Sequence, residues 1–371
     1  METMTMPDPT CGPPEEAPGV PPIECRNLWK IYGDNDREAL AAMQAENLTK
    51  EEVLDRFGCG VGVVDASFTV NEGEIFCIMG LSGSGKSTLV RHVNRLIEPT
   101  GGCVLIDGED INTMDMAQLR ALRADKIGMV FQNMALLPHK NVRQNVAFGL
   151  ELRGVPRQER HEVAAKALGV VHLSEWADAY PDELSGGMQQ RVGLARALAA
   201  DPGILLMDEP FSALDPLIRR QLQDQFLELS REMDKTTLFI THDLDEAIRI
   251  GNRIAIMKDG VLVQIGTPEE IVTRPADEYV ADFVAGISRL HLVYAHTIMR
   301  TPEFFRTKNP GVNLDDCPVT GPETDLDTLI DLMVGTDEKY ISIEDCGRRV
   351  GVVTRSGLLR GIQGKEAEDK E

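Results

Sequence analysis

Gly80-Leu81-Ser82-Gly83-Ser84-Gly85-Lys86-Ser87-Thr88 is the stretch that decides the fold, because it fits the phosphate-loop pattern G-x-x-x-x-G-K-[ST]. The apolar run 74–79 before it predicts a buried strand, and 88–97 after it predicts a helix. The glycines let several backbone N–H groups face one centre, to which the helix N-terminus adds positive charge. The pattern predicts that Lys86 reaches the β- and γ-phosphates of a nucleotide and that Ser87 binds Mg²⁺. An ordinary Gly/Ser turn is the alternative, and the flanking strand and helix argue against it.

Composition and charge limit the possible functions. The formal net charge is −22 over 371 residues, which argues against non-specific binding to nucleic acid or to anionic lipid. The sequence has no run of 18 or more uncharged apolar residues, so we expect no membrane span, and residues 1–22 do not resemble a signal peptide. Seven cysteines without C-x-x-C spacing suit a reducing cytoplasm. We therefore expect a cytoplasmic protein without a nucleic-acid partner, whose attachment to a membrane is docking to a protein.

Changes in composition along the chain predict its division into parts. Strand and helix patterns alternate through the largest part, which predicts an α/β core with a largely parallel sheet. A capping box at Thr49-Lys50-Glu51-Glu52 predicts a helix within an insert of that part. In chain order we expect a flexible tail (1–22), the α/β part (23–285) with its helical insert (34–60), a linker (286–326), a small α+β segment (327–364) and a charged tail (365–371).

A second apolar run, Ile204-Leu205-Leu206-Met207-Asp208-Glu209, ends in two carboxylates. Parallel strands that are buried on both faces form continuous apolar runs, and ligands bind beyond their carboxyl ends. Asp208 is therefore expected to hold Mg²⁺, and Glu209 to polarise a water for attack on the γ-phosphate. Taken alone, this run could equally be a solvated strand end. Its occurrence together with the phosphate loop favours the catalytic interpretation.

Leu184-Ser185-Gly186-Gly187-Met188-Gln189-Gln190-Arg191 is the second decisive motif. Ser185 is expected to cap a helix that starts near Gly187, and the glycine pair lets a phosphate approach the backbone closely. Between a phosphate loop and an apolar-Asp-Glu strand, this motif resembles the signature sequence of ATP-binding cassette (ABC) proteins. In that family the signature closes over the nucleotide of the other subunit. The resemblance implies a homodimer with two sandwiched ATP molecules, contacted by Leu184, Ser185, Gly186, Gly187 and Gln189.

Further motifs stand in the order of the family. Gln132, in Val130-Phe131-Gln132-Asn133, matches the glutamine loop that contacts Mg²⁺ and water, and Asp215, in Ser212-Ala213-Leu214-Asp215, matches the loop that crosses between subunits. His242 matches the switch histidine at the γ-phosphate, and Tyr32 matches the aromatic residue that stacks on adenine. Trp29 competes with Tyr32 for that position. The alternatives are a surface turn for Gln132, a structural histidine for His242 and a core aromatic for Tyr32.

The resemblance covers about 23–283 and implies a P-loop NTPase fold, with a RecA-like core and a helical subdomain. It also implies Mg²⁺-dependent ATP hydrolysis. The implied catalytic residues are Glu209, His242 and Gln132, the metal-holding residues are Ser87, Gln132 and Asp208, and the ATP-contacting residues are Tyr32, Gly80, Ser82, Gly83, Ser84, Gly85, Lys86, Ser87 and Thr88.

Within the family, the chain resembles the ATPase subunit of glycine betaine/proline betaine importers. This resemblance rests on the insert 34–60 and on the amino-acid sequences of the phosphate loop and of residues 94–100, 211–219 and 242–247. It implies an integral membrane permease and, through it, a periplasmic substrate-binding protein, with the chain on the cytoplasmic face of the inner membrane. The implied cargo is a quaternary amine such as glycine betaine, proline betaine or choline.

Two alternatives to this function stay open. One is an importer ATPase for another small solute such as trimethylamine N-oxide, since the cargo never touches this subunit. The other is a soluble, non-transport ABC ATPase of DNA repair or translation. Repair types insert long coiled coils between Lys86 and Ser185, where this chain has only about a hundred residues, and translation types carry two cassettes per chain.

The segment 327–364 resembles part of a CBS module, a unit that in the family regulates transport. Its pattern predicts a strand, a second strand and a helix. CBS motifs that bind nucleotides carry an acidic residue three positions after the threonine, and here Gly357 stands three positions after Thr354. The resemblance therefore implies regulation or support of the dimer, without binding of adenosine.

Overall fold

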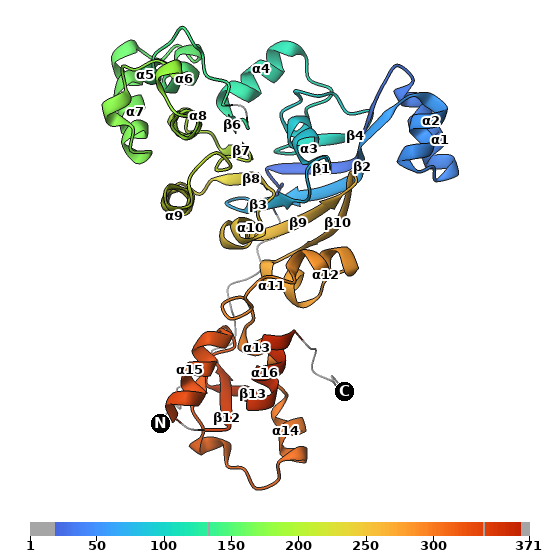
Figure 1. The fold of residues 1–371 in the computed structure, drawn as a ribbon, viewed down its shortest axis with the longest axis vertical. Coiled ribbons are helices and arrows are strands. Elements are labelled where there is room, and N and C mark those ends of the chain that lie inside the picture. Colours follow the sequence, from blue (N-terminus) through green and yellow to red (C-terminus); the bar gives the residue numbers. More distant parts are fainter. Residues whose placement is uncertain (1–18, 133, 337, 365–371) are drawn as a thin grey trace, which may run out of the picture.

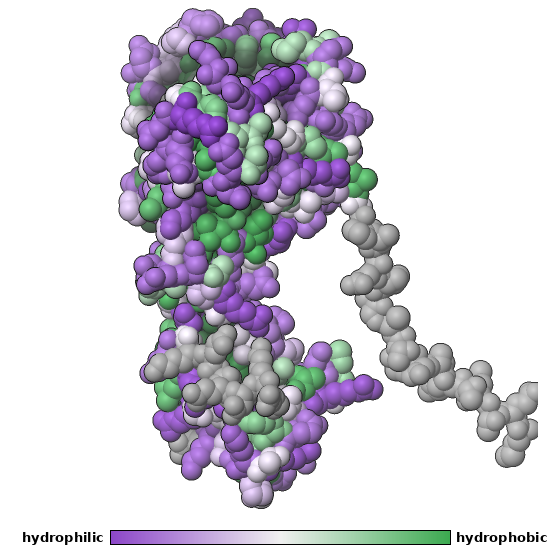
Figure 2. All heavy atoms as spheres, turned by 90° about the vertical axis from the view of Figure 1, so that its right-hand side faces the viewer, coloured by the Kyte–Doolittle hydropathy of each residue, from purple (hydrophilic) through white to green (hydrophobic). Residues whose placement is uncertain are grey.

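The computed structural model describes residues 19–132, 134–336 and 338–364, which form two lobes joined by a narrow waist (Figure 1). Most of the two expected tails, 1–18 and 365–371, lies outside the described residues. Hydrophilic side chains dominate the face drawn in Figure 2, and apolar atoms gather on the larger lobe just above the waist. Among the described helices, none is both long and apolar enough to cross a membrane.

Two sheets build the larger lobe. An antiparallel sheet has the strand order β2-β1-β4-β5, and a six-stranded sheet has the order β10-β9-β3-β8-β7-β6. In the second sheet β10 runs antiparallel to its neighbour and the other strands run parallel, as the sequence predicts. The strands are β1 (Ile23–Tyr32), β2 (Gly60–Val70), β3 (Ile75–Met79), β4 (Gly101–Ile106), β5 (Glu109–Asp110), β6 (Ile127–Val130), β7 (Ile204–Asp208), β8 (Thr236–Thr241), β9 (Arg253–Lys258) and β10 (Val261–Gly266).

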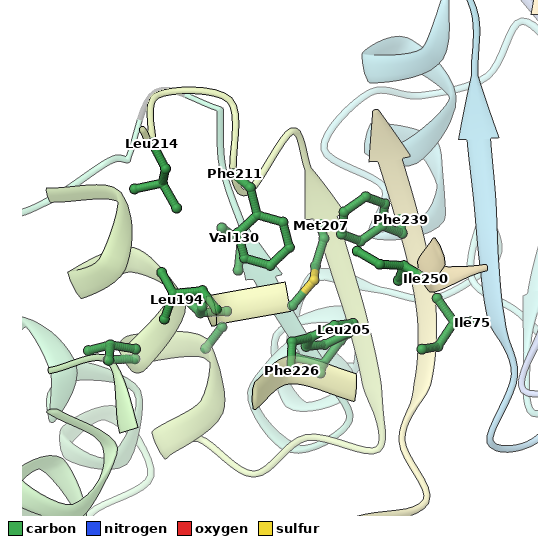
Figure 3. Packing of buried hydrophobic residues seen from close by; sticks show 14 of the residues in the cluster. Ile75, Val130, Leu194, Leu205, Met207, Phe211, Leu214, Phe226, Phe239 and Ile250 are labelled. Atoms are coloured by element: carbon green, nitrogen blue, oxygen red, sulfur yellow. The ribbon is translucent and has the colours of Figure 1, made fainter. Parts of the chain in front are cut away.

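The central strands β3, β7 and β8 are buried along their whole length, which explains their continuous apolar sequences. One core lies between the two sheets, where Phe68 stacks on Phe76 with 5.2 Å between ring centroids. A second core lies on the opposite face, where Phe211, Phe226 and Phe239 pack near Met207 (Figure 3). The carboxyl ends of these strands therefore meet at one firmly packed edge.

Helices cover the six-stranded sheet, and α5 to α8 form a helical subdomain to one side (green in Figure 1). The helix expected over 88–97 instead begins at Lys86 and ends at Val93, because Arg95 has a φ of 51°, which an α-helix does not accommodate. The helices are α3 (Lys86–Val93), α4 (Met116–Asp125), α5 (Val142–Val146), α6 (Phe148–Leu152), α7 (Arg157–Val170), α8 (Gly186–Ala199), α9 (Pro216–Met233), α10 (Leu244–Ile250), α11 (Pro268–Thr273) and α12 (Glu278–Val284).

The insert between β1 and β2 contains α1 (Asp36–Glu46) and α2 (Lys50–Phe57). The predicted capping box is present: Thr49 Oγ1 accepts from the N–H of Glu52, and Glu52 Oε2 accepts from the N–H of Thr49 at 2.7 Å. A small core joins the two helices to β1 through buried Ala39, Val53 and Ile31. The insert is therefore packed onto the strand that ends beside the phosphate loop.

The smaller lobe begins earlier in the chain than the sequence predicts. The segment 286–326, expected to be a linker, contains two α-helices, a 3₁₀ turn (Leu314–Asp316) and a strand, and its Val293 and Ile298 share a core with Leu329 and Ile341. Those elements are short and contribute at most two buried residues each, so they leave no periodic pattern. The lobe consists of α13 (Ala295–Ile298), α14 (Pro302–Lys308), β11 (Val319–Thr320), α15 (Leu326–Thr336), β12 (Tyr340–Asp345), β13 (Arg348–Thr354) and α16 (Arg355–Gln363).

Candidate functional site

The phosphate loop joins β3 to α3 at the carboxyl edge of the six-stranded sheet. Gly80 and Gly85 have φ values of 154° and 105°. A Cβ atom would lie 2.1 Å from the Met257 carbonyl oxygen at Gly80 and 2.4 Å from the Gly62 carbonyl oxygen at Gly85, so both positions need glycine. The predicted phosphate-contacting residues lie together in this loop and the first turn of α3: Gly80, Ser82, Gly83, Ser84, Gly85, Lys86, Ser87 and Thr88.

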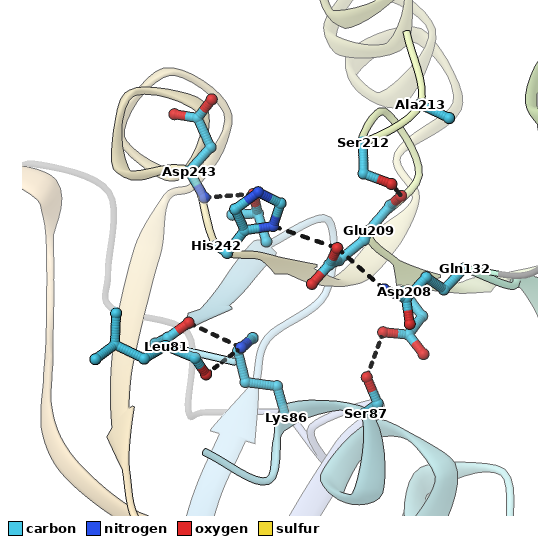
Figure 4. Close-up of polar contacts among 12 residues, drawn as sticks. Leu81, Lys86, Ser87, Gln132, Asp208, Glu209, Ser212, Ala213, His242 and Asp243 are labelled. Carbon is cyan, nitrogen blue, oxygen red and sulfur yellow. Dashed lines mark hydrogen bonds and ion pairs between the residues drawn. The ribbon is translucent and has the colours of Figure 1, made fainter. Parts of the chain in front are cut away.

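The Lys86 side chain curls back into the loop. Its Nζ donates hydrogen bonds to the carbonyl oxygens of Gly80 at 2.8 Å and Leu81 at 2.9 Å (Figure 4). Burial lowers the pKa of Lys86, while the nearby carboxylates of Glu209 and Asp208 act in the opposite direction. The loop thus presents a largely desolvated amine to any anion that binds in it.

Ser87 and Asp208 face each other across the edge of the sheet. Ser87 Oγ donates to Asp208 Oδ1 at 2.9 Å (Figure 4). Asp208 Oδ2 is buried without a hydrogen-bond partner, and its nearest cation is the Arg91 guanidinium at 3.7 Å. Burial raises the pKa of Asp208, and Ser87 and Arg91 partly offset that rise. A carboxylate with one unused oxygen beside a hydroxyl is a donor set that fits Mg²⁺.

Glu209 lies between two other predicted catalytic residues. Its Oε2 accepts from Gln132 Nε2 at 3.3 Å and lies 3.2 Å from His242 Nδ1 (Figure 4). The Glu209 side chain is 15% exposed, and that of His242 is 58% exposed. The Glu209 backbone has a φ of 49°, and its N–H donates to the Ile240 carbonyl at 3.0 Å. The structure therefore brings together three residues that come from three separate loops.

Tyr32 is the aromatic residue beside the phosphate loop. Its hydroxyl lies 3.1 Å from Thr88 Oγ1, and the residue is 43% exposed, so it is not a core aromatic. Trp29 packs instead against the small core of the insert, which includes Ile31 and Ala39. An exposed ring next to the loop can stack on a planar base, and the geometry favours Tyr32 over Trp29 for that role.

The signature residues start α8 in the helical subdomain. The helix begins at Gly186, one residue earlier than expected, and Ser185 Oγ accepts from the N–H of Met188. Ser185 and Gly186 are exposed, and a Cβ on Gly186 would meet no atom within 4 Å. Because α8 and α3 lie apart in Figure 1, the structure does not bring these residues to the chain's own phosphate loop.

Two of the predicted signature residues, Leu184 and Gln189, also make contacts within their own chain. Leu184 is buried, and the Gln189 amide donates to the carbonyls of Pro181 at 2.8 Å and Leu184 at 3.3 Å. These two side chains stabilise the turn, whereas Ser185 and Gly186 are exposed and Gly187 is half-buried. Asp215 is exposed and accepts from the N–H of Ile218 at 3.1 Å, so it caps α9.

Three residues at the site were missed by the sequence analysis. Arg91 faces Asp208, and the signal was available, since it lies four residues after Ser87 on the same helix. Gln190 and Ser212 both donate to the Glu209 carbonyl, at 3.0 and 3.1 Å. Gln190 stands within the signature itself, yet its spacing gives no sign that it reaches the catalytic strand.

The chain is similar to known proteins over most of its length. Residues 63–212 match a family model described as ABC transporter. A glycine betaine/proline betaine transport system ATP-binding protein of Salmonella typhimurium is 51% identical over 350 residues, which are 93% of this chain and 84% of that protein. A trimethylamine N-oxide transport system ATP-binding protein of Ruegeria pomeroyi is 45% identical over 341 residues, which are 92% of this chain and 97% of that protein.

The chain also has a fold similar to that of solved structures. The dimeric structure of MJ0796, a bacterial ABC transporter cassette, is 33% identical and has a TM-score of 0.58, and the match covers 66% of this chain and 98% of that one. The matched 66% of the chain is close to the share of the residues that form the larger lobe. The chain belongs to the ABC transporter family, among its ATP-binding, ATP-hydrolysing subunits.

Proposed function

We propose that the chain is the ATP-hydrolysing subunit of an importer for quaternary amines such as glycine betaine, proline betaine or choline. The observation that carries the chemistry is the meeting of Lys86, the Ser87–Asp208 pair and Glu209 at one edge of the sheet. The extensive similarity to a betaine-transport ATP-binding protein supports the cargo class.

Each residue of the site has a proposed role in hydrolysis. Glu209 positions and deprotonates the attacking water, with its carboxylate oriented by Gln132 and His242. Lys86 neutralises charge on the β- and γ-phosphates, and Tyr32 stacks on the adenine. Mg²⁺, when bound, compensates phosphate charge. Ser87, Gln132 and Asp208 are the residues that would hold it.

A second copy of the chain completes the site in this proposal. The signature residues lie away from the chain's own phosphate loop, on an exposed helix start with backbone N–H groups free to meet an anion. A head-to-tail homodimer would place that start over the partner's nucleotide, with Asp215 at the crossing. The solved relative is a dimeric cassette, which supports this arrangement.

A permease is the proposed membrane partner. Between α4, β6, α6 and α8 lies a groove of 290 Å³, whose lining includes the aromatic rings of Phe131 and Phe148 and the basic side chains of Arg153 and Arg196. The loop that follows, with half-buried Leu136 and Leu137 and exposed Pro138, adds apolar contact area for a helix of the permease. The subunit would then be peripheral on the cytoplasmic face of the inner membrane, and a periplasmic substrate-binding protein would act through the permease, without nucleic acid.

Trimethylamine N-oxide is the second candidate cargo, since a transport protein of that name is 45% identical. Uptake of labelled glycine betaine, choline and trimethylamine N-oxide by cells that express the chain with its permease separates these cargoes. Dependence of betaine or choline uptake on this chain is the expected result. Uptake of trimethylamine N-oxide alone would replace the first cargo with the second.

Glu209→Gln tests the proposed chemistry directly. The amide keeps the size of the side chain and an acceptor for Gln132 but cannot take a proton, so turnover should fall by about 10²- to 10⁴-fold while ATP affinity stays within about twofold. Glu228→Gln, an exposed change on α9, is the matched control. Phosphate release and equilibrium nucleotide binding are the measurements, and retained hydrolysis would show that the base lies elsewhere.

The smaller lobe is proposed to regulate transport or to support the dimer, as a partial CBS-like module. Thr354 caps α16 by accepting from the N–H of Gly357 at 3.0 Å, and a Cβ at Gly357 would lie 3.4 Å from the Ile298 carbonyl oxygen. The position therefore offers no acceptor for ribose hydroxyls and little room for one. Regulation by another signal is consistent with this geometry.

A further inference from the structure

The carbonyl group of Glu209 is held by donors from two elements. Gln190 Nε2 donates to it at 3.0 Å, Ser212 Oγ at 3.1 Å and the Ser212 N–H at 3.3 Å. Gln190 belongs to α8, the helix that the signature begins, and only 1% of it is exposed. The buried Gln190 amide therefore contacts the backbone of the predicted catalytic residue directly.

We propose that Gln190 is a positioning residue that ties the signature helix to the catalytic carboxylate. This inference rests on the proposed role of Glu209 as the base. Gln190 does not touch the reacting groups: it acts by fixing the peptide group that follows Glu209.

The oxygen of the same amide accepts a hydrogen bond from the loop 212–215, which is proposed to cross between subunits. Gln190 Oε1 accepts from the N–H of Ala213 at 3.0 Å, and its Nε2 also lies 3.5 Å from Ser212 Oγ. Donor and acceptor are both used, so the amide has one satisfied orientation. The residue therefore links α8 at the same time to Glu209 and to the loop proposed to cross the dimer.

Glu209 needs such fixation because of its backbone. Its φ of 49° lies in the left-handed region, which residues with a Cβ occupy rarely and keep only when their surroundings enforce it. The Ile240 carbonyl holds the N–H side of the residue, and Gln190 with Ser212 holds the carbonyl side. If the carbonyl side is released, the peptide can rotate and carry the carboxylate away from Gln132 and His242.

Helix α8 also reaches the loop proposed to meet the permease. Arg196 donates to the carbonyls of Ala135 at 2.7 Å and Met134 at 2.9 Å. Arg196 and Gln190 are six residues apart, about 9 Å along a rigid helix. A displacement of that loop or of the signature turn would therefore move Gln190, and Gln190 would pass the displacement to Glu209.

Two substitutions separate the bonds of Gln190. Gln190→Met fits the buried volume and removes both bonds, whereas Gln190→Glu keeps an acceptor for the N–H of Ala213 and loses the donor to Glu209. Gln225→Met is the control, because among the described residues its amide bonds only to His172, away from Glu209. All variants are made in the full-length chain and compared by their kcat and KM for MgATP hydrolysis, their ATP affinity and their unfolding midpoint.

Both Gln190 variants should lose about 10- to 100-fold in kcat, since a small misplacement of a catalytic group has an effect of that size. The KM and the ATP affinity should change less than about twofold, because Lys86 and the phosphate loop are untouched. A purely structural role would lower the unfolding midpoint and leave kcat of the folded protein unchanged. A kcat within twofold of wild type for Gln190→Met, or a near-normal Gln190→Glu, would overturn the proposal.

Measuring Glu209→Gln in parallel distinguishes a failure of the positioning role of Gln190 from a failure of the role of Glu209 as the base. If Glu209→Gln is inactive and Gln190→Met turns over normally, the positioning role fails and the proposed function stands. If Glu209→Gln turns over normally, the role of Glu209 fails and the positioning role fails with it.

Discussion

Acid should destabilise the larger lobe through one buried histidine on α3. The His92 side chain has no exposed surface, and its Nδ1 lies 2.6 Å from the Thr88 carbonyl oxygen. A carbonyl only accepts, so Nδ1 carries the proton and Nε2, which is buried without a partner, is the unprotonated nitrogen. A proton added there would create a buried charge. Burial accordingly lowers the pKa of His92 from 6.5 to about 4.

The size of the effect follows from linkage between protonation and folding. The unfolded chain takes up the proton near pH 6.5 and the folded chain only near pH 4, so the stability is fully present above pH 6.5 and is lost as the pH falls towards 4. At 1.36 kcal/mol per pKa unit, the free energy of unfolding should drop by about 1.4 kcal/mol at pH 5.5 and about 2.5 kcal/mol at pH 4.5, with no drop at pH 7.5.

Urea unfolding at those three pH values measures the drop. The fluorescence of Trp29 and Trp176 reports on the larger lobe, which contains both tryptophans. Other groups titrate in the same range, so the comparison is with His92→Gln, whose amide can still donate to Thr88 and does not titrate. The difference between the two proteins should change by about 2.5 kcal/mol from pH 7.5 to 4.5. A difference that stays constant within about 0.5 kcal/mol would refute the assignment.

Two further substitutions test the nucleotide site and the waist. Lys86→Ala removes the desolvated amine from the phosphate loop and should weaken MgATP binding at least about tenfold, since hydrogen bonds to charged groups contribute about 1.5–3 kcal/mol each; unchanged affinity in a binding titration would contradict the role of Lys86. Glu269→Ala removes the carboxylate on α11 that accepts from Thr297 and lies 3.3 Å from His296 Nε2, so hydrogen exchange of the amides around Thr297 should quicken by about tenfold. Asp282→Ala is the control, and equal protection in both variants would show that Glu269 does not fasten the smaller lobe.

The strands of the larger lobe could be predicted from the sequence because their burial is visible in short stretches of it. Strands buried on both faces must be apolar throughout, so β3, β7 and β8 are visible as runs, and the residues that follow them must meet at one edge. The prediction that Asp208 and Glu209 lie near Lys86 is a consequence of that rule. The roles assigned to them are still predictions.

The contacts that could not be predicted join residues with no shared pattern. The Gln190 amide reaches Glu209 nineteen residues away, and nothing in a helix start fixes which side chain will turn inwards. The same holds for Gln189, whose amide donates to the carbonyl of Pro181, while its contact with the partner's nucleotide stays a prediction. The first half of the smaller lobe was missed because short helices such as α13 carry too few residues to show a period.

Charge is distributed so that one surface of an acidic protein can attract an acidic partner. The net charge is −22, which would repel carboxylates over most of the surface. In the groove proposed for the permease, the guanidinium groups of Arg123, Arg153 and Arg196 donate to backbone carbonyls, so within the described part of the chain their charge is not paired with carboxylates. A partner helix with acidic and apolar side chains would satisfy this groove. A partner that docks there would contact Arg196 and could displace α8. Because Gln190 lies on the same helix, that displacement would change the position of Glu209, the proposed base.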